Sequence, residues 1–193
     1  LKLSLNRYLF LIFAFLIGLL FSKFLLSVTL FFLVGNWIFE GELKKKILVL
    51  FRNKAAIFFL LIFALHIVGL IYTSDFNYAL KDLRVKLPLL VLPIVFGSIE
   101  PFPQKYIKQI IRFFVLLVLV SSIFSIVTYY QAPHLAHRNT SPFIHHIRFS
   151  LLVTIAFFFV IYEALCKKSK SFSIQLLYWL IASYLFLFIL LFL

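Results

Sequence analysis

Long apolar runs, separated by short polar and basic stretches, make up most of this sequence. A helix that spans a bilayer needs about 20 predominantly apolar residues, with a range of roughly 17–25. Four runs have this length and carry few charges: residues 55–72, 113–130, 147–165 and 174–193. The pattern therefore predicts four transmembrane helices at these positions.

Three further apolar runs are shorter. Residues 8–21 and 24–39 flank Ser22-Lys23, and two short spans fit better than one long helix, which would exceed the thickness of a normal bilayer core. Residues 87–99 cover only about 20 Å at ~1.5 Å per residue, and Pro88 and Pro93 would kink a helix there. This weakest segment needs residues 83–86 to complete a crossing.

The distribution of basic residues predicts the orientation. Residues 40–54 and 166–173 are rich in lysine, and the positive-inside rule places both loops in the cytoplasm. An even number of crossings must separate them, which supports counting the weak segment. The N-terminus is then cytoplasmic, and the outer loops are residues 73–86 and 131–146.

The composition agrees with a membrane protein. The chain is 64% hydrophobic, against roughly 45–50% for a soluble domain. Its net charge of +13 lies in loops between apolar runs, which fits membrane-adjacent loops better than nucleic-acid binding. We expect an all-α, polytopic transmembrane bundle of about seven helices, forming a single domain over residues 1–193. The chain starts at Leu1, has no Met and stops inside an apolar run, so we also expect it to be part of a larger bundle.

The first outer loop predicts a short amphipathic helix. Ser74 or Asp75 is a suitable N-cap, and an apolar stripe follows at helical spacing, made of Phe76, Leu80, Leu83 and Leu87. Lys81 and Arg84 share one flank, and Asp82 and Lys86 lie at i, i+4 on the other. This helix either rests at the membrane surface with snorkelling cations or presents a cationic wall to a phosphorylated lipid. Arg84 is the best phosphate ligand, because guanidinium offers a bidentate fork.

The second outer loop holds four of the five histidines: His134, His137, His145 and His146. A metal site is conceivable, but the loop has no Cys or carboxylate to complete it, so hydrogen bonding or substrate contact is favoured. Arg148 lies just inside the outer end of an apolar helix, where an unpaired charge is costly. It either snorkels to the interface or binds an anion at the rim of a cavity, and it could share that anion with Arg84.

Two more ionisable residues lie within predicted spans. His66 is interpreted as a hydrogen-bonded packing residue in preference to a functional one, and Glu163 is expected to reach the Lys167-Lys168 loop. The sequence contains no Gly-rich phosphate loop and no paired-carboxylate motif.

Both outer loops resemble the O-antigen ligase and polymerase superfamily of bacterial envelopes, in its Bacteroidetes-type members. The segments that carry the resemblance are residues 69–75 (GLIYTSD), 81–90 (KDLRVKLPLL) and 139–150 (NTSPFIHHIRFS). Such proteins are multi-pass enzymes of the inner membrane. They transfer a glycan from an undecaprenyl-diphosphate carrier, at the periplasmic face, to an acceptor such as lipid A-core or a growing chain, without a metal or other cofactor.

The resemblance also implies roles for particular residues. Arg84, Arg148 and Lys81 would bind the diphosphate, with Arg138, His145 and His146 as secondary contacts. The catalytic base would lie in a later periplasmic loop, beyond Leu193, so this portion of the chain is expected to be inactive alone.

Two other classes of protein remain open. A transporter or channel would carry ionisable residues near the membrane midplane and often inverted repeats, but only His66 is a candidate and no repeat is evident. The membrane anchor of a sensor or assembly protein would have no chemistry of its own.

Overall fold

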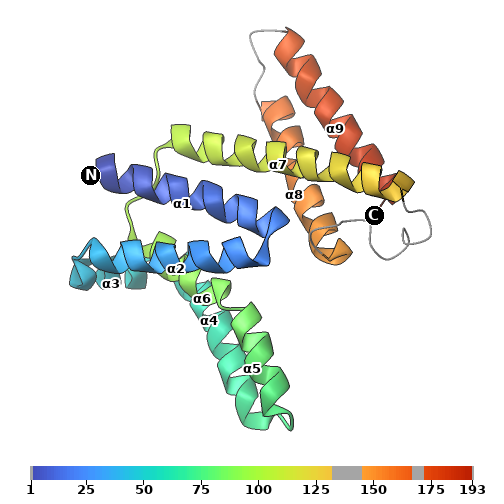
Figure 1. Cartoon of the computed structure of the whole chain (residues 1–193). Helices are drawn as coiled ribbons and strands as arrows, with labels where there is room; N and C mark the ends of the chain where they lie inside the picture. The colour runs from blue at the N-terminus through green and yellow to red at the C-terminus, as the bar shows by residue number, and fades with distance from the viewer. Residues whose placement is uncertain (1, 132–144, 167–171, 193) are drawn as a thin grey trace. The chain divides into compact units, whose positions relative to one another are not determined.

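The computed structural model describes residues 2–131, 145–166 and 172–192 (Figure 1). Within these ranges the chain is all helical, as predicted. The elements in order are α1 (Lys2–Phe21), α2 (Lys23–Phe39), α3 (Leu43–Arg52), α4 (Lys54–Gly69), the 3₁₀ turn η1 (Leu70–Tyr72), α5 (Phe76–Val85), α6 (Pro88–Ser98), α7 (Gln104–Gln131), α8 (His146–Cys166) and α9 (Phe172–Phe192).

Four helices in the described ranges are long and apolar enough to cross a membrane. They are Lys54–Tyr72, Gln104–Gln131, His146–Cys166 and Phe172–Phe192, and they coincide with the four clear apolar runs. The chain is therefore a multi-pass membrane protein with an all-α fold. A fifth span is counted only if α2 and α3, which are bent by 114° at their junction, form one broken crossing.

The shorter apolar runs form helices where they were predicted, of 20 residues in α1, 17 in α2 and 11 in α6. The chain turns at Ser22 between α1 and α2, so two helices replace one long one, as expected. The weak segment differs from its prediction, because residues 83–85 belong to α5 and α6 begins only at Pro88. Proline fits the first turn of a helix, where its missing N–H is not needed. With 11 residues, α6 extends only about 16 Å.

The bend between α2 and α3 depends on an unusual backbone. Gly41 has φ +77° and Glu42 has φ +54°, so two successive residues lie in the left-handed region. Glycine adopts this region freely, whereas a residue with a Cβ does so at a cost. The turn converts residues 43–52, predicted as a basic loop, into the separate amphipathic helix α3.

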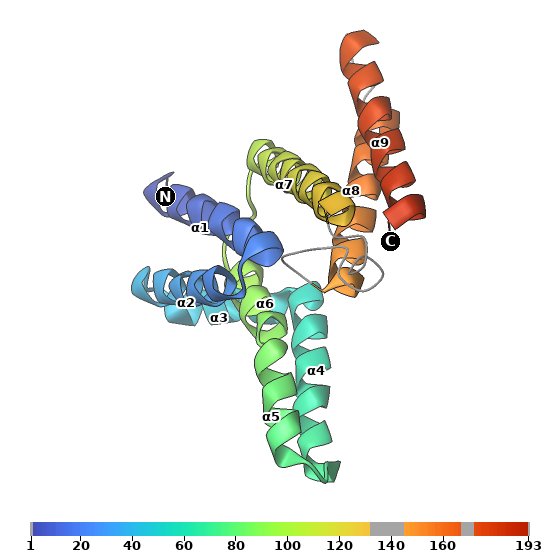
Figure 2. The same cartoon turned by 45° about the vertical axis from the view of Figure 1, so that its right-hand side comes forward.

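The chain divides into two compact units, residues 1–11 with 27–103 and residues 12–26 with 104–193. In the first unit, α4 packs closely against α6, and α3 packs against both (Figure 2). A small core of Tyr8, Leu33 and Val95 joins α1, α2 and α6. In the second unit, α8 packs along α9 and α7 packs against both. The single domain predicted over residues 1–193 stays a prediction.

A close approach of backbones joins α4 and α6. A Cβ added to Gly97 would lie 2.5 Å from the Cβ of Ala56 and 3.1 Å from Leu50 Cδ1. Asn53 Nδ2 donates to the Gly97 carbonyl at 3.4 Å, while Asn53 Oδ1 accepts from the Ala56 N–H at 3.2 Å as the N-cap of α4. One asparagine therefore caps α4 and ties it to α6.

A chain of polar side chains links α1, α2, α3 and α6. Tyr8 Oη donates to Glu40 Oε2 at 2.9 Å, and Lys46 Nζ lies 2.9 Å from the same oxygen. Lys46 also donates to the Trp37 carbonyl at 2.7 Å, and Trp37 Nε1 donates to Ser98 Oγ at 2.7 Å. Lys46 belongs to the basic stretch of residues 40–54, yet it is buried, because Glu40 balances its charge.

Candidate functional site

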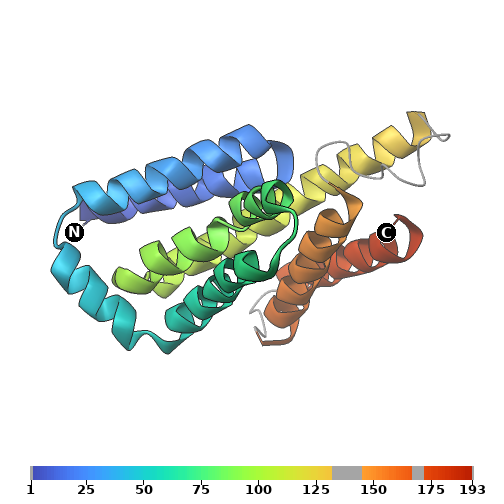
Figure 3. The ribbon, with the colours of Figure 1, turned by 90° about the horizontal axis from the view of Figure 1, so that it is seen from below.

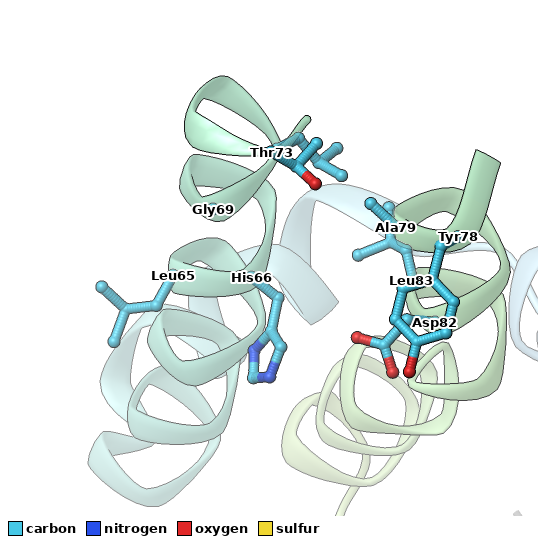
Figure 4. Close-up of a pocket in the computed structure, with 9 residues that line it drawn as sticks. Leu65, His66, Gly69, Thr73, Tyr78, Ala79, Asp82 and Leu83 are labelled. Carbon is cyan, nitrogen blue, oxygen red and sulfur yellow. The ribbon is translucent and has the colours of Figure 1, made fainter. Parts of the chain in front are cut away.

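The candidate site is a cavity of about 430 Å³ between the end of α4 and α5 (Figure 4). Its wall combines apolar side chains with four that can form hydrogen bonds: His66, Thr73, Tyr78 and Asp82. Ligand sites in proteins are typically cavities of roughly 300–1,000 Å³ with a few convergent polar groups. Both the size and the lining of this cavity fit that description.

The N-terminus of α5 is fixed by a side-chain cap. Asp75 Oδ1 accepts a hydrogen bond from the Tyr78 N–H at 2.9 Å, which satisfies one of the free amides at the start of the helix. Of the two N-caps that the sequence allowed, the structure uses Asp75. The cap sets the rotation of α5, so that Tyr78, Ala79, Asp82 and Leu83 line the cavity.

His66 enters the cavity from α4. Figure 4 shows its ring pointing toward α5, where Tyr78 and Asp82 form the facing wall. Its Nδ1 lies 2.8 Å from the Ile62 carbonyl oxygen, which can only accept, so Nδ1 carries the proton and Nε2 is the nitrogen left for a ligand. The bond within the helix agrees with the packing interpretation of His66, but the cavity lining adds a second possible role.

Asp82 is held in place by an ion pair across one turn of α5. Lys86 Nζ lies 2.6 Å from Asp82 Oδ2, which confirms the i, i+4 pairing suggested by the spacing. The pair balances the charge of the carboxylate at the cavity wall. Together with the Tyr78 hydroxyl and the His66 ring, the wall then offers both donors and acceptors, an arrangement suited to a neutral, hydroxylated ligand.

A glycine leaves room for this cavity. A Cβ added to Gly69 would meet no heavy atom of the described residues within 4 Å, so they give no packing reason for glycine at this position. Gly69, Thr73 and Tyr78 line the cavity but were not singled out as site residues. The sequence did contain one signal for Tyr78. It lies at i, i+4 to Asp82, so both side chains share the face of α5 that lines the cavity.

The two cations of α5 face outward. Lys81 and Arg84 are exposed, and neither forms an ion pair in the part of the chain that the structure describes. Three of the four residues in the predicted apolar stripe, Phe76, Leu80 and Leu87, are also exposed. α5 thus presents cations and apolar side chains together, as an interfacial helix does.

At the end of the second outer loop the structure describes His145 and His146, which lie at the start of α8 in the second unit. Arg148 is exposed on the first turn of α8. The rings of His145 and His146 are 4.3 Å apart, and His146 is half-buried. Arg84 belongs to the first unit, so an anion shared by Arg84 and Arg148 stays a prediction.

Several predicted contacts fall outside the described residues. Arg138, His134 and His137 are among them, as is the Lys167-Lys168 loop that Glu163 was expected to reach. Over residues 2–131, 145–166 and 172–192, no group of three or more His, Cys, Asp and Glu side chains is placed to hold a metal ion.

Comparisons of the chain with protein-family models, curated proteins and solved structures find no match.

Proposed function

We propose that this chain is part of a periplasm-facing glycosyltransferase of the bacterial inner membrane. It moves a glycan from an undecaprenyl-diphosphate carrier to an acceptor such as lipid A-core or a growing chain. The observation that carries the proposal is α5, where exposed Lys81 and Arg84 lie on a short amphipathic helix beside a cavity with hydrogen-bonding walls.

The chemistry of this transfer requires fixed positive charge. When the glycosyl bond to the diphosphate breaks, negative charge grows on the leaving oxygen. Guanidinium groups held near that oxygen stabilise the transition state more than the ground state. In this proposal, Arg84 grips the diphosphate with Lys81 beside it, and Arg148 supplies a second guanidinium from α8.

The cavity beside α5 supports the proposal through its polar wall. A glycan carries many hydroxyl groups. The Tyr78 hydroxyl can donate to them or accept from them, while His66 Nε2 and the Asp82 carboxylate can accept. His66 is placed here as a contact and not as the catalytic base, which the proposal assigns to a later part of the longer protein.

Substitution of the arginines in the full-length protein tests the proposal. Loss of one transition-state donor commonly raises the barrier by about 2.7–4 kcal/mol, so Arg84→Ala and Arg148→Ala should each lower glycan transfer by roughly 10²–10³-fold. The measurement is transfer from a lipid-diphosphate-linked glycan in membranes that contain equal amounts of inserted protein. Arg52→Ala is the matched control, because Arg52 is an exposed arginine on α3, and its activity should be unchanged.

Full activity in both arginine variants would refute the roles given to them. The predicted topology has an independent test. Single cysteines at positions 84 and 148, in a background where Cys166 is replaced by Ser, should react with a membrane-impermeant reagent from the periplasmic side. Labelling of the two positions from opposite sides would contradict the shared diphosphate site.

A further inference from the structure

A second cavity of about 680 Å³ lies between α1 and α2, away from the residues proposed for glycan transfer. These helices run side by side, and α3 follows the end of α2 (Figure 3). The groove is lined by Asn6, Arg7, Phe10, Leu11, Phe31, Phe32, Gly35, Asn36 and Phe39. Most of these side chains are apolar or aromatic, whereas the polar ones gather at one end.

The two ends of the groove differ in chemistry. The Tyr8–Glu40 hydrogen bond places the start of α1 beside the end of α2, so Asn6, Arg7 and Asn36 lie at the same end. Phe31 and Phe32 extend the groove away from it and are 75% and 56% exposed. A groove with a cation at its head and an aromatic wall along its length matches an amphiphile with an anionic head and an apolar tail.

The nearby acidic groups leave Arg7 available to an anion. Glu40 already binds Tyr8 and Lys46, and Glu42 pairs with Lys45. Arg7 is exposed and forms no ion pair within the described ranges. The same end of α2 leads into α3, which exposes Lys44 and Lys45 together with Ile47, Leu48 and Phe51. A basic amphipathic helix of this kind is typical of helices that bind membrane surfaces with anionic lipid headgroups.

Gly35 gives the groove its depth. A Cβ added there would meet only Phe39 Cε2, at 4.0 Å, so no neighbouring atom in the described structure requires glycine. Glycine disfavours a helix by about 1 kcal/mol relative to alanine. Gly35 therefore weakens α2 without allowing any closer packing, and what it provides is open space on the groove wall.

We propose that this groove binds an acidic phospholipid, with its phosphate at Arg7 and an acyl chain along the aromatic wall. The lipid is a bound component of the fold and takes no part in glycan transfer. None of the groove residues belongs to α5. A failure of the lipid-binding proposal would therefore leave the proposal of glycan transfer unaffected, and the reverse also holds.

Quenching of Trp37 fluorescence by brominated lipids tests this site. Trp37 lies next to Asn36 on α2, and the chain has one other tryptophan, Trp179, which is replaced by Phe as background. The full chain is reconstituted in phosphatidylcholine vesicles that contain a small fraction of brominated phosphatidylglycerol or brominated phosphatidylcholine. One cation near the surface favours an acidic lipid by about fivefold, so the acidic lipid should quench Trp37 at about one-fifth of the concentration.

Three variants separate the groove from general surface charge. Arg7→Gln should abolish the preference for the acidic lipid. Gly35→Leu should reduce quenching by both lipids, because the leucine side chain occupies space in the groove, and its Cβ is accommodated at 4.0 Å from Phe39 Cε2. Lys44→Gln removes the same charge at the same end of the unit but lies outside the groove, and it should retain most of the preference.

Three results would overturn the proposal. The first is equal quenching by the two lipids in the parent protein. The second is a loss of preference in Lys44→Gln as complete as that in Arg7→Gln. The third is weak quenching that rises as the protein is diluted in lipid, which would mean that a second copy of the chain fills the groove.

Discussion

The two units of this chain are packed by different kinds of side chain. In the first unit, hydrogen bonds and an ion pair connect helices through Tyr8, Glu40, Lys46, Trp37 and Ser98. In the second, aromatic rings pack among aliphatic side chains. Phe149 and Phe188 are buried with their rings 5.9 Å apart, and the buried residues around them include Val153, Ala156, Ala182 and Leu185.

The difference accompanies a difference in the helices. In lipid, apolar side chains gain little by exchanging contact with lipid for contact with protein, so long helices associate mainly through close packing of complementary shapes. α7, α8 and α9 are long and continuous and can associate mainly in this way. α2, α3 and α6 are shorter or bent, and directional polar contacts join them to one another and to α1. We therefore predict that replacing a polar side chain by alanine destabilises the first unit far more than the second.

Removal of Glu40 should have the largest effect. Glu40→Ala leaves Lys46 buried without its counter-charge, and breaking such a pair commonly costs about 3–5 kcal/mol. We expect about 3 kcal/mol, because the Glu40 side chain is 26% exposed. The measurement is the free energy of unfolding in mixed micelles titrated with a denaturing detergent.

Glu42→Ala is the matched control for Glu40→Ala. Glu42 pairs with Lys45 at 3.2 Å, but both side chains are more than two-thirds exposed. Such a pair contributes at most about 0.5–1 kcal/mol. Equal losses in the two variants would show that the polar chain does not hold the first unit together.

Substitution of Gly97 should have the next largest effect. In Gly97→Ala the new Cβ lies 2.5 Å from the Ala56 Cβ, so α4 and α6 must separate. Overpacking of this kind typically costs 1–3 kcal/mol, and we expect about 2 kcal/mol in the same unfolding measurement. Adding Ala56→Gly should recover most of the loss.

Gly69→Ala controls for the general effect of replacing a helical glycine. Among the residues that the structure describes, none has an atom within 4 Å of the added Cβ, so we expect no loss of stability and a gain of up to about 1 kcal/mol from helix propensity. If Gly97→Ala is equally harmless, the close contact between α4 and α6 is not needed for stability.

The second unit should be less sensitive than the first to the loss of a polar side chain. Ser122 Oγ lies 2.9 Å from the Tyr184 hydroxyl, a hydrogen bond between α7 and α9. Such bonds between membrane helices average about 0.6 kcal/mol, and Ser122→Ala should reduce stability by this amount. Ser183→Ala should have no effect, because Ser183 is exposed and bonds only within its own helix. A loss in Ser122→Ala as large as that in Glu40→Ala would remove the contrast between the units.

The sequence predicted the features that depend on neighbouring residues. Run length identified the four long spans, because the thickness of a bilayer sets how many apolar residues a helix needs. Residue spacing identified α5 and the Asp82–Lys86 pair, and it limited the N-cap to Ser74 or Asp75, since all of these features form within one or two helical turns. The roles of Arg84 and Arg148 rest on resemblance and await the activity measurements.

Only the tertiary structure decided which polar residues meet. Lys44, Lys45 and Lys46 are equivalent by composition, yet Lys46 alone of the three is buried, because the left-handed turn at Gly41 and Glu42 brings it to Glu40. Partners such as Tyr8 and Glu40, or Trp37 and Ser98, are 32 and 61 residues apart, and no periodicity records such distances. Gly97 and Gly35 both lie in apolar helices, but one sits against Ala56 and the other opens a groove. The difference between the two glycines depends on which helix packs beside each of them, and the residues around each glycine in the sequence do not specify that neighbour.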